Sequence, residues 1–325
     1  KRIGTMAESI SKELVIVGGG PAGLRAAEEA QNNNIDYIVL EKGKPAQAWR
    51  DIRTTMKLLS PCHPQRDWTS LSPDFPIWKL GVERPYCSAG EFVDYIDAYV
   101  NEFNFNLKRN QSVNSVERNG ETYIVSANDV DYHTPVVLIA TGIFGNPYIP
   151  PIPGVEKNPY VTHTHYYHKP EDFYGKRVLI VGAGNSAAET AIELAGRAMV
   201  YMVTRRDLLY FSDTKRLYDI RGISESFLKE LISMEIIRYK PHQEIVRIED
   251  NQVYFRDWKL MVDSIMFGAG YRPVLDPVRN FKLKFNKNNY PENSFSGESM
   301  QMPNLFFAGP LAFHSAASIV LHGFV

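Results

Sequence analysis

Short apolar runs bounded by turn residues recur along the chain and predict buried strands. Between them lie stretches in which apolar residues repeat at helical spacing. This alternation of strand and helix is typical of an α/β protein built on parallel sheets. The predicted strands occupy residues 14–17, 35–40, 107–116, 121–127, 136–140, 177–181, 200–203, 261–267 and 304–308, and residues 244–255 are predicted to form paired strands.

Helices are predicted between several of these strands. The segment from Ser88 to Phe103 has an N-cap serine with Glu91 three residues later, which is the pattern of a capping box. Its apolar residues share one face and predict a core-facing helix. Further helices are predicted from Leu24, over 188–198, over 211–238 after an irregular start, and over 314–321. The segment from 53 to 85 is rich in proline, serine and aspartate and predicts a long loop that is functional or mobile.

A glycine-rich turn follows the first apolar strand. Gly18 permits a sharp turn, Gly20 leaves room beside the backbone, and Gly23 allows helix and strand to pack closely. With Pro21 and Ala22, these residues form the strand–turn–helix pattern that binds a dinucleotide diphosphate at a helix N-terminus.

An acidic residue ends the second predicted strand. Glu41 lies about 20 residues beyond the turn, the spacing of a carboxylate that accepts hydrogen bonds from ribose hydroxyls. Lys42 follows it. The pair strengthens the interpretation of the glycine turn as a nucleotide site.

The same pattern recurs in the second half of the chain, where Gly182 and Gly184 belong to a second turn. The strand that follows ends in Thr204, Arg205 and Arg206 instead of an acid. Two guanidinium groups suit a 2′-phosphate and therefore predict NADP(H), unless they are simply solvated. The remaining residues of this predicted turn are Asn185, Ser186 and Ala187.

The last predicted strand of each half of the chain is followed by a similar segment. The strand at 136–140 runs into Ala140, Thr141 and Gly142, and the strand at 261–267 runs into Gly268 to Pro273. This internal repeat predicts two three-layer, Rossmann-like dinucleotide-binding domains, the second inserted into the first. The predicted boundaries are 1–150 with 274–325 for the first domain and 151–273 for the second.

Composition adds limits. A net charge of -1 gives no electrostatic argument for nucleic acid or an anionic membrane as a partner, and no apolar run is long enough to span a bilayer. The two cysteines, Cys62 and Cys87, form no C-x-x-C pair. We therefore expect a cytoplasmic protein without a membrane anchor.

Three histidines lie within six residues: His163, His165 and His168. They suggest a metal site, although His168 would leave the strand face that the other two share. The alternative is a surface or cofactor-edge strand, and the sequence leaves both open. Trp49 is likewise either a core residue or part of a cofactor site.

Two glycine turns, an acid after the first and arginines after the second, resemble the flavoproteins with two dinucleotide-binding domains. The resemblance covers nearly all of the chain from Leu14 and implies FAD at the first turn and NADPH at the second. It implies flavin contacts from Ala140, Thr141 and Gly142, and from Gly309, with Pro310 standing where the family usually has aspartate. The flavin-side segment that it implies includes Trp49 and Arg50.

Two branches of that family compete. Disulfide reductases carry a redox cysteine pair or, in the bacillithiol disulfide reductase type, one cysteine inside the first glycine turn, where this chain has Ala22. Residues 48–50, 60–61, 74–76 and 163–177 instead resemble flavin-containing monooxygenases. The latter resemblance implies NADPH, O2 and a small amine, sulfide or ketone oxygenated through a C4a-hydroperoxyflavin, with no side chain named as catalytic. The alternatives are an NADPH-dependent reductase of a disulfide, quinone or electron carrier, and a non-catalytic flavoprotein. A homodimer is the family habit.

Overall fold

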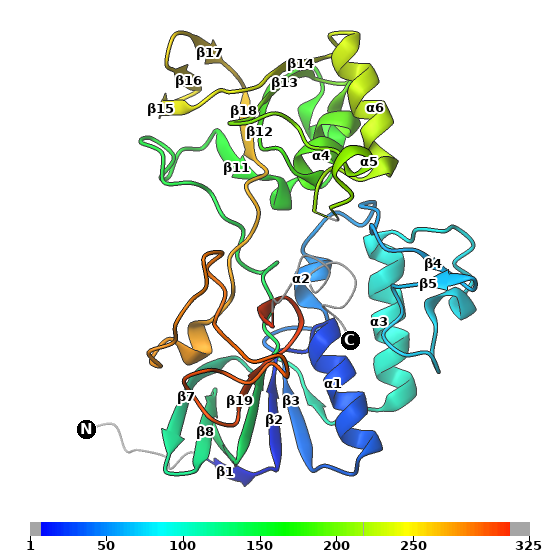
Figure 1. Ribbon diagram of the computed structural model, residues 1–325, viewed down its shortest axis with the longest axis vertical. Helices are drawn as coiled ribbons and strands as arrows, with labels where there is room; N and C mark the ends of the chain where they lie inside the picture. The colour runs from blue at the N-terminus through cyan, green and yellow to red at the C-terminus, as the bar shows by residue number, and fades with distance from the viewer. Residues whose placement is uncertain (1–7, 217, 313–325) are drawn as a thin grey trace. The chain divides into compact units, whose positions relative to one another are not determined.

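The computed structural model describes residues 8–216 and 218–312, so the predicted helix at 314–321 lies outside the described residues. The chain divides into two compact units. Unit 1 comprises Lys1–Arg50, Thr54–Asn146 and Arg272–Val325, and unit 2 comprises Asp51–Arg53 and Pro147–Tyr271. The sequence did not predict that the three residues 51–53 belong with the second unit. Both units combine helices with parallel sheets, which confirms the α/β class (Figure 1).

Unit 1 is built on a five-stranded parallel sheet in the order β19-β10-β2-β3-β6. The carboxyl ends of its strands therefore lie along one edge. Val15, Ile16 and Val39 are fully buried at its centre, as continuous apolar strands require. The strands are β2 (Leu14–Val17), β3 (Tyr37–Leu40), β6 (Leu107–Lys108), β10 (Val136–Ile139) and β19 (Leu305–Phe307).

Helices α1 (Pro21–Asn32) and α3 (Ala89–Phe103) lie beside this sheet (Figure 1). The first begins at Pro21, three residues before the predicted start. The capping box of α3 is confirmed, since the Ser88 side chain accepts from the Glu91 N–H and Glu91 accepts from the Ser88 N–H. The predicted apolar face of α3 is fully buried through Phe92, Tyr95, Ile96 and Tyr99. A short helix, α2 (Gln47–Arg50), precedes the loop.

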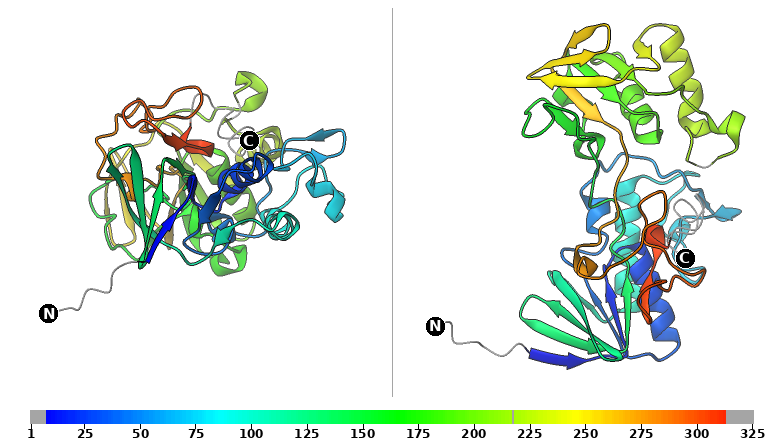
Figure 2. Two further views of the ribbon diagram at one scale, coloured as in Figure 1. Left: turned by 90° about the horizontal axis from the view of Figure 1, so that it is seen from below. Right: turned by 60° about the vertical axis from the view of Figure 1, so that its left-hand side comes forward.

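A second sheet, in the order β1-β9-β8-β7, completes the three layers of unit 1, and Figure 2 shows it from two further sides. The prediction of one strand over 107–116 is wrong. The chain leaves the parallel sheet after Lys108 and enters this second sheet at Val113, so residues 109–112 connect two layers. The strands are β1 (Glu8–Ser11), β7 (Val113–Asn119), β8 (Thr122–Ala127) and β9 (Val130–Thr134).

The predicted loop from 53 to 85 is largely irregular, as expected. It contains the two-residue strands β4 (Cys62–His63) and β5 (Arg66–Asp67) and the 3-10 helix η1 (Ile77–Leu80). The return segment of unit 1 contains η4 (Asp276–Val278) and η5 (Gly309–Leu311).

Unit 2 repeats the plan with a parallel sheet in the order β11-β18-β12-β13-β14. Arg238 lies in β14, so the prediction of helix up to that residue is wrong. The strands are β11 (Val161–His163), β12 (Arg177–Val181), β13 (Met199–Val203), β14 (Ile237–Lys240) and β18 (Ser264–Phe267). The helical elements are η2 (Thr164–Tyr166), η3 (Pro170–Phe173), α4 (Asn185–Leu194), α5 (Phe211–Thr214) and α6 (Gly222–Ser233).

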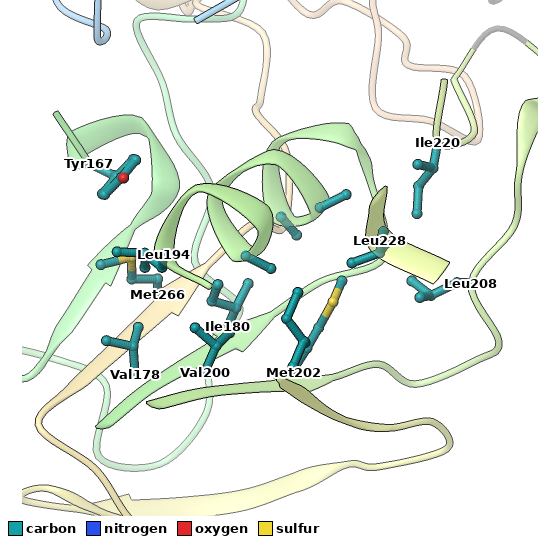
Figure 3. Packing of buried hydrophobic residues seen from close by; sticks show 14 residues of the cluster. Tyr167, Val178, Ile180, Leu194, Val200, Met202, Leu208, Ile220, Leu228 and Met266 are labelled. Carbon is teal, nitrogen blue, oxygen red and sulfur yellow. The ribbon is translucent and has the colours of Figure 1, made fainter. Parts of the chain in front are cut away.

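Side chains of the central strand β12 alternate between two cores. Val178 and Ile180 face helices α4 and α6, where they pack in the cluster shown in Figure 3. Leu179 faces the opposite way, into a cluster with Ile248 and Phe255. That second cluster lies under an antiparallel sheet of β15 (Ile245–Glu249), β16 (Gln252–Phe255) and β17 (Lys259–Met261). Unit 2 therefore has the same helix–sheet–sheet layering as unit 1.

Candidate functional site

A cavity of about 340 Å³ lies along the carboxyl edge of the parallel sheet of unit 1. Its walls come from the ends of β2 and β3 and from the segments that follow β6, β10 and β19. This is the edge at which open α/β sheets bind ligands. Of the residues singled out in the sequence, the lining includes Gly18, Gly20, Pro21, Ala22, Glu41, Lys42, Trp49, Ala140, Thr141, Gly142 and Pro310.

The first glycine turn is shaped by its lack of side chains. Gly18 has φ +111°, and a Cβ there would lie 2.6 Å from the Ala140 carbonyl oxygen. A Cβ on Gly23 would lie 1.9 Å from the Gly18 oxygen. A Cβ on Gly20, by contrast, would meet nothing within 4 Å, so the missing side chain leaves open space at the N-terminus of α1. Space and free N–H groups there fit a diphosphate.

The Glu41 carboxylate is held firmly at the end of β3. It is only 5% exposed, Oε2 accepts the Gly19 N–H at 2.7 Å, and Oε1 accepts the Gly43 N–H at 2.8 Å. These bonds fix an acceptor group at the cavity wall, one strand away from the glycine turn.

Trp49 satisfies both of its predicted roles, because it is buried and also lines the cavity. Its ring lies 4.9 Å from that of Phe92 and 5.5 Å from that of Phe144, both edge-on. Arg50 does not line the cavity. Its guanidinium donates to the Pro45 carbonyl at 2.9 Å and to Asp97 at 2.5 Å, so it secures the end of α2.

Gly23 and Gly309 also stand behind the cavity wall instead of lining it. Gly309 has φ +63° and turns the chain so that Pro310 reaches the cavity. Sequence reasoning missed several lining segments, because their signal lies in the sheet order: residues 109–112 follow β6, the neighbour of β3. The missed residues include Gln111, Ser112, Val113, Ile143, Phe144, Val274 and Asp276.

The second glycine turn has related geometry in unit 2. Gly182 has φ +153°, and a Cβ there would lie 2.5 Å from the Gly268 oxygen. Gly184 caps α4 and has nothing within 4 Å of its Cβ position. Ala187, which is fully buried, packs against Gly268, where a Cβ would approach the Ala187 Cβ to 2.8 Å. Ser186, half-buried, lies in the first turn of α4.

Asn185 and Thr204 both make hydrogen bonds within the unit. The Asn185 amide donates to the Asp219 carbonyl at 3.1 Å and accepts from the Arg221 N–H at 2.8 Å. Thr204 is buried, with its hydroxyl 2.9 Å from that of Tyr239. These two side chains therefore stabilise the segments that border the turn.

Arg205 and Arg206 are exposed at the carboxyl end of β13. Within the described parts of the chain, neither guanidinium has an ion-pair or hydrogen-bond partner. Two unpaired cations beside a glycine turn are available for an anionic group of a ligand.

Two residues of the histidine cluster do not lie on the surface, which was one part of the prediction of a surface or cofactor-edge strand. His163 and His165 are buried, and across residues 8–216 and 218–312 no group of three or more His, Cys, Asp or Glu side chains could hold a metal. His163 Nδ1 accepts the His165 N–H at 3.0 Å, which places the proton on Nε2, 3.0 Å from the Gly270 carbonyl. Burial lowers the pKa of His163 to about 4. The imidazole is therefore neutral and anchors the strand exit at Gly270.

The two cysteines contact each other, which their sequence spacing did not reveal. Both thiols are free and buried. Burial raises the pKa of Cys62 and, more strongly, that of Cys87. Neither thiol is poised to act as a thiolate nucleophile. Among the described residues, no helix is both long and apolar enough to cross a membrane.

Paired dinucleotide turns in repeated three-layer units define a class of nucleotide-dependent oxidoreductases. The chain belongs to the pyridine nucleotide-disulphide oxidoreductase family, whose match covers residues 15–309. At this level the predicted oxidoreductase activity, the two-domain flavoprotein class and the cofactors FAD and NADPH are confirmed.

Curated relatives include an uncharacterized CzcO-like oxidoreductase of Geobacillus kaustophilus, 29% identical over 61% of this chain and 56% of its own length. The CzcO oxidoreductase of Bacillus subtilis is 27% identical over 81% of this chain and 82% of its own. The probable indole-3-pyruvate monooxygenase YUCCA10 of Arabidopsis thaliana is 33% identical over 56% of this chain, and the match spans about half of that protein, 48%.

Solved structures share the fold across almost the whole chain. Bacillithiol disulfide reductase from Staphylococcus aureus superposes with a TM-score of 0.83 at 22% identity, covering 97% of this chain and 96% of its own. A flavin-containing monooxygenase from Stenotrophomonas maltophilia gives 0.81 at 24% identity, covering 96% and 95%. At these identities the likeness concerns the fold, and both branches share it.

Proposed function

We propose that the cavity of unit 1 holds FAD. The order of strand ends along its edge supports this assignment. A diphosphate at the β2 turn and a ribose at Glu41 on β3 would leave adenine beyond β3, toward the segment after β6. The flavin would then extend the other way, past Ala140 on β10 to Pro310 after β19.

Lys42 supports the same arrangement. Its ammonium lies 3.6 Å from the Cβ position of Gly145, so the side chain extends across the cavity from the end of β3 toward the segment after β10. A cation there would offset diphosphate charge. Trp49 and Phe144 form an apolar wall suited to an aromatic ring.

NADPH would bind in unit 2. Its diphosphate would lie at Gly184 and the N-terminus of α4, and its 2′-phosphate would meet Arg205 and Arg206. The unpaired, exposed state of these arginines is the observation that favours NADPH over NADH.

The proposed reaction is the NADPH-dependent oxygenation of a small amine, sulfide or ketone by O2. Bound flavin supplies hydride acceptance and oxygen activation, while the protein positions both nucleotides and excludes water. The buried cysteines carry the choice between branches, because dithiol chemistry needs an accessible thiolate and both thiols have raised pKa values. Similarity to enzymes described as monooxygenases supports the same choice.

The decisive experiment supplies NADPH and ¹⁸O2 to the purified yellow protein with amines, sulfides and ketones. Oxygenation predicts one labelled oxygen atom in product for each NADPH consumed. If every NADPH appears as hydrogen peroxide across all substrates, the oxygenase proposal is wrong. Failure of NADPH to bleach the flavin without oxygen would instead indicate a non-catalytic flavoprotein.

The rival proposal is reduction of a disulfide, quinone or electron carrier, which the family description and the disulfide-reductase fold support. Changing Cys62 and Cys87 to serine tests the form of this rival that uses protein thiols, and the ¹⁸O2 experiment tests the quinone and electron-carrier forms. We expect unchanged NADPH oxidation, because neither thiol is available for chemistry. Loss of turnover with flavin still bound would favour thiol chemistry.

A further inference from the structure

Gln111 is a polar residue of the proposed FAD site that the assignment above does not use. Gln111 lines the cavity on the connection between β6 and β7. Its backbone N–H donates to the Glu41 carbonyl at 2.8 Å, which places it directly beside the proposed ribose site. It lies on the side of Glu41 away from the glycine turn, where the strand order puts adenine.

The Gln111 amide makes no hydrogen bond within residues 8–216 and 218–312. Its Oε1 is buried and has no partner. A buried acceptor without a donor costs roughly 1–3 kcal/mol, so a ligand that donates to it gains affinity. Because no hydrogen bond holds the amide, it can turn about its last torsion and present either oxygen or nitrogen to the cavity without breaking a hydrogen bond.

Adenine offers the matching groups. Its 6-amino group donates and an adjacent ring nitrogen accepts, while a glutamine amide accepts through oxygen and donates through nitrogen. Flavin and nicotinamide rings also carry donors and acceptors that an amide could meet, so the strand order, which puts adenine on this side of Glu41, decides which ring Gln111 faces. The residue is therefore suited to reading the base instead of the sugar or the diphosphate.

We propose that Gln111 recognises the 6-amino edge of adenine and makes the first site selective for an adenine dinucleotide. This inference rests on the proposed FAD site and adds a specificity-determining residue to it. The selectivity comes from one amide, so it can be removed without changing the turn that binds the diphosphate.

The test measures binding to flavin-free protein by the quenching of flavin fluorescence. The ligands are FAD and its purine analogue, in which hydrogen replaces the 6-amino group. We expect the native protein to bind the analogue about ten-fold more weakly. In Gln111→Met the two ligands should bind equally, and Gln111→Glu, which keeps an acceptor oxygen, should restore a preference for FAD.

Gln47 provides a matched control, since it lines the same cavity but its Oε1 already accepts the Lys44 N–H at 3.1 Å. Gln47→Met should affect both ligands alike. Equal binding of both ligands to the native protein, or an unchanged preference in Gln111→Met, would overturn the role of Gln111. If Gln111→Met binds neither ligand, Gln111→Ala carries the same comparison. Absence of FAD binding by the native protein would instead overturn the FAD site itself.

Discussion

The two glycine turns solve one packing problem with exchanged residues. In unit 1 the helix contributes Gly23 and the crossing strand contributes Ala140, whose Cβ would lie 3.4 Å from a Cβ on Gly23. In unit 2 the helix contributes Ala187 and the strand exit contributes Gly268, where a Cβ would approach that of Ala187 to 2.8 Å. In unit 1 the Gly18 oxygen excludes a Cβ on Gly23, and in unit 2 the Ala187 methyl excludes a Cβ on Gly268, so the two units place the residue without a side chain on opposite partners.

The backbone hydrogen bond that ties each turn to the next strand is the same in both units. Gly18 N–H donates to Leu40 at 2.9 Å, and Gly182 N–H donates to Val203 at 3.1 Å. The two units differ at the end of the next strand. Unit 1 has the buried carboxylate of Glu41 there, and unit 2 has the exposed guanidinium groups of Arg205 and Arg206. The shared geometry thus fixes where a diphosphate binds, and the strand ends distinguish the nucleotides.

The largest effect is expected when the cations of the second turn are removed. Each charge-assisted bond to a phosphate contributes roughly 1.5–3 kcal/mol, so changing Arg205 and Arg206 to glutamine should lower the preference for NADPH over NADH by about 100-fold. Steady-state kinetics with both cofactors measures it. Arg256→Gln, an exposed arginine of the same unit, should change nothing. Equal losses for NADPH and NADH would contradict phosphate recognition.

The second largest effect is expected on stability, when the residues at the corresponding helix positions of the two turns, Gly23 and Ala187, are exchanged. Gly23→Ala drives a Cβ to 1.9 Å from the Gly18 oxygen and should destabilise the protein by about 2–3 kcal/mol. Ala187→Gly only removes a methyl from the corresponding helix and should cost about 1 kcal/mol. Urea unfolding measures both. Similar values for the two variants would mean that the contacts are not exchanged as described.

Alanine in place of Gly20 or Gly184, whose Cβ positions lie in open space, should have a smaller effect, and only on cofactor binding. Gly20→Ala and Gly184→Ala place a methyl in empty space at φ -79° and -103°, which alanine tolerates. Stability should hold, while FAD affinity falls about ten-fold in the first variant and NADPH affinity falls similarly in the second. Fluorescence titration and the KM for NADPH report the two sites. A variant that weakens both cofactors equally would show that the assignments are not independent.

Local sequence signals predicted those features that depend on residues close together in the chain. Spacing and residue type predicted the conformations of Gly18, Gly182 and the capping box at Ser88, and the structure confirms each. Contacts that depend on sheet order were missed. Gln111 looked like mid-strand because residues 107–116 are continuous in pattern, and only the neighbouring strands show that the chain changes sheets there.

The contact between Cys62 and Cys87 was missed for the same reason, since 24 residues of irregular chain separate them. Arg50 was assigned to the cofactor by resemblance, yet a nearby acid on α3, Asp97, binds its guanidinium. Charged side chains choose among several partners within reach, and the sequence order does not rank those partners.

The helices that follow the two turns also differ in how they hold an acidic side chain that is mostly removed from solvent, and this difference gives the smallest expected effect. On α1, Glu28 accepts from Ser72 at 2.7 Å and from Tyr99 and Arg25. On α4, Glu189 faces Arg53 at 3.3 Å, and the neighbouring Glu193 shares that one guanidinium. Burial raises the pKa of Glu189 to about 7, although Arg53 opposes the rise.

Because the folded pKa of Glu189 lies above its ordinary value of 4.5, folding takes up a proton between about pH 4.5 and 7. Stability from this group is present below that window and is lost as the pH rises through it. Glu189→Gln removes the titration, so its stability relative to the native protein should rise by about 1 kcal/mol from pH 6 to pH 7. Urea unfolding at both pH values measures the change, and Glu171→Gln, on the exposed surface of η3, is the control. A constant difference across the window would mean that Glu189 is ionised at pH 6, and that Arg53 alone satisfies it as fully as three partners satisfy Glu28.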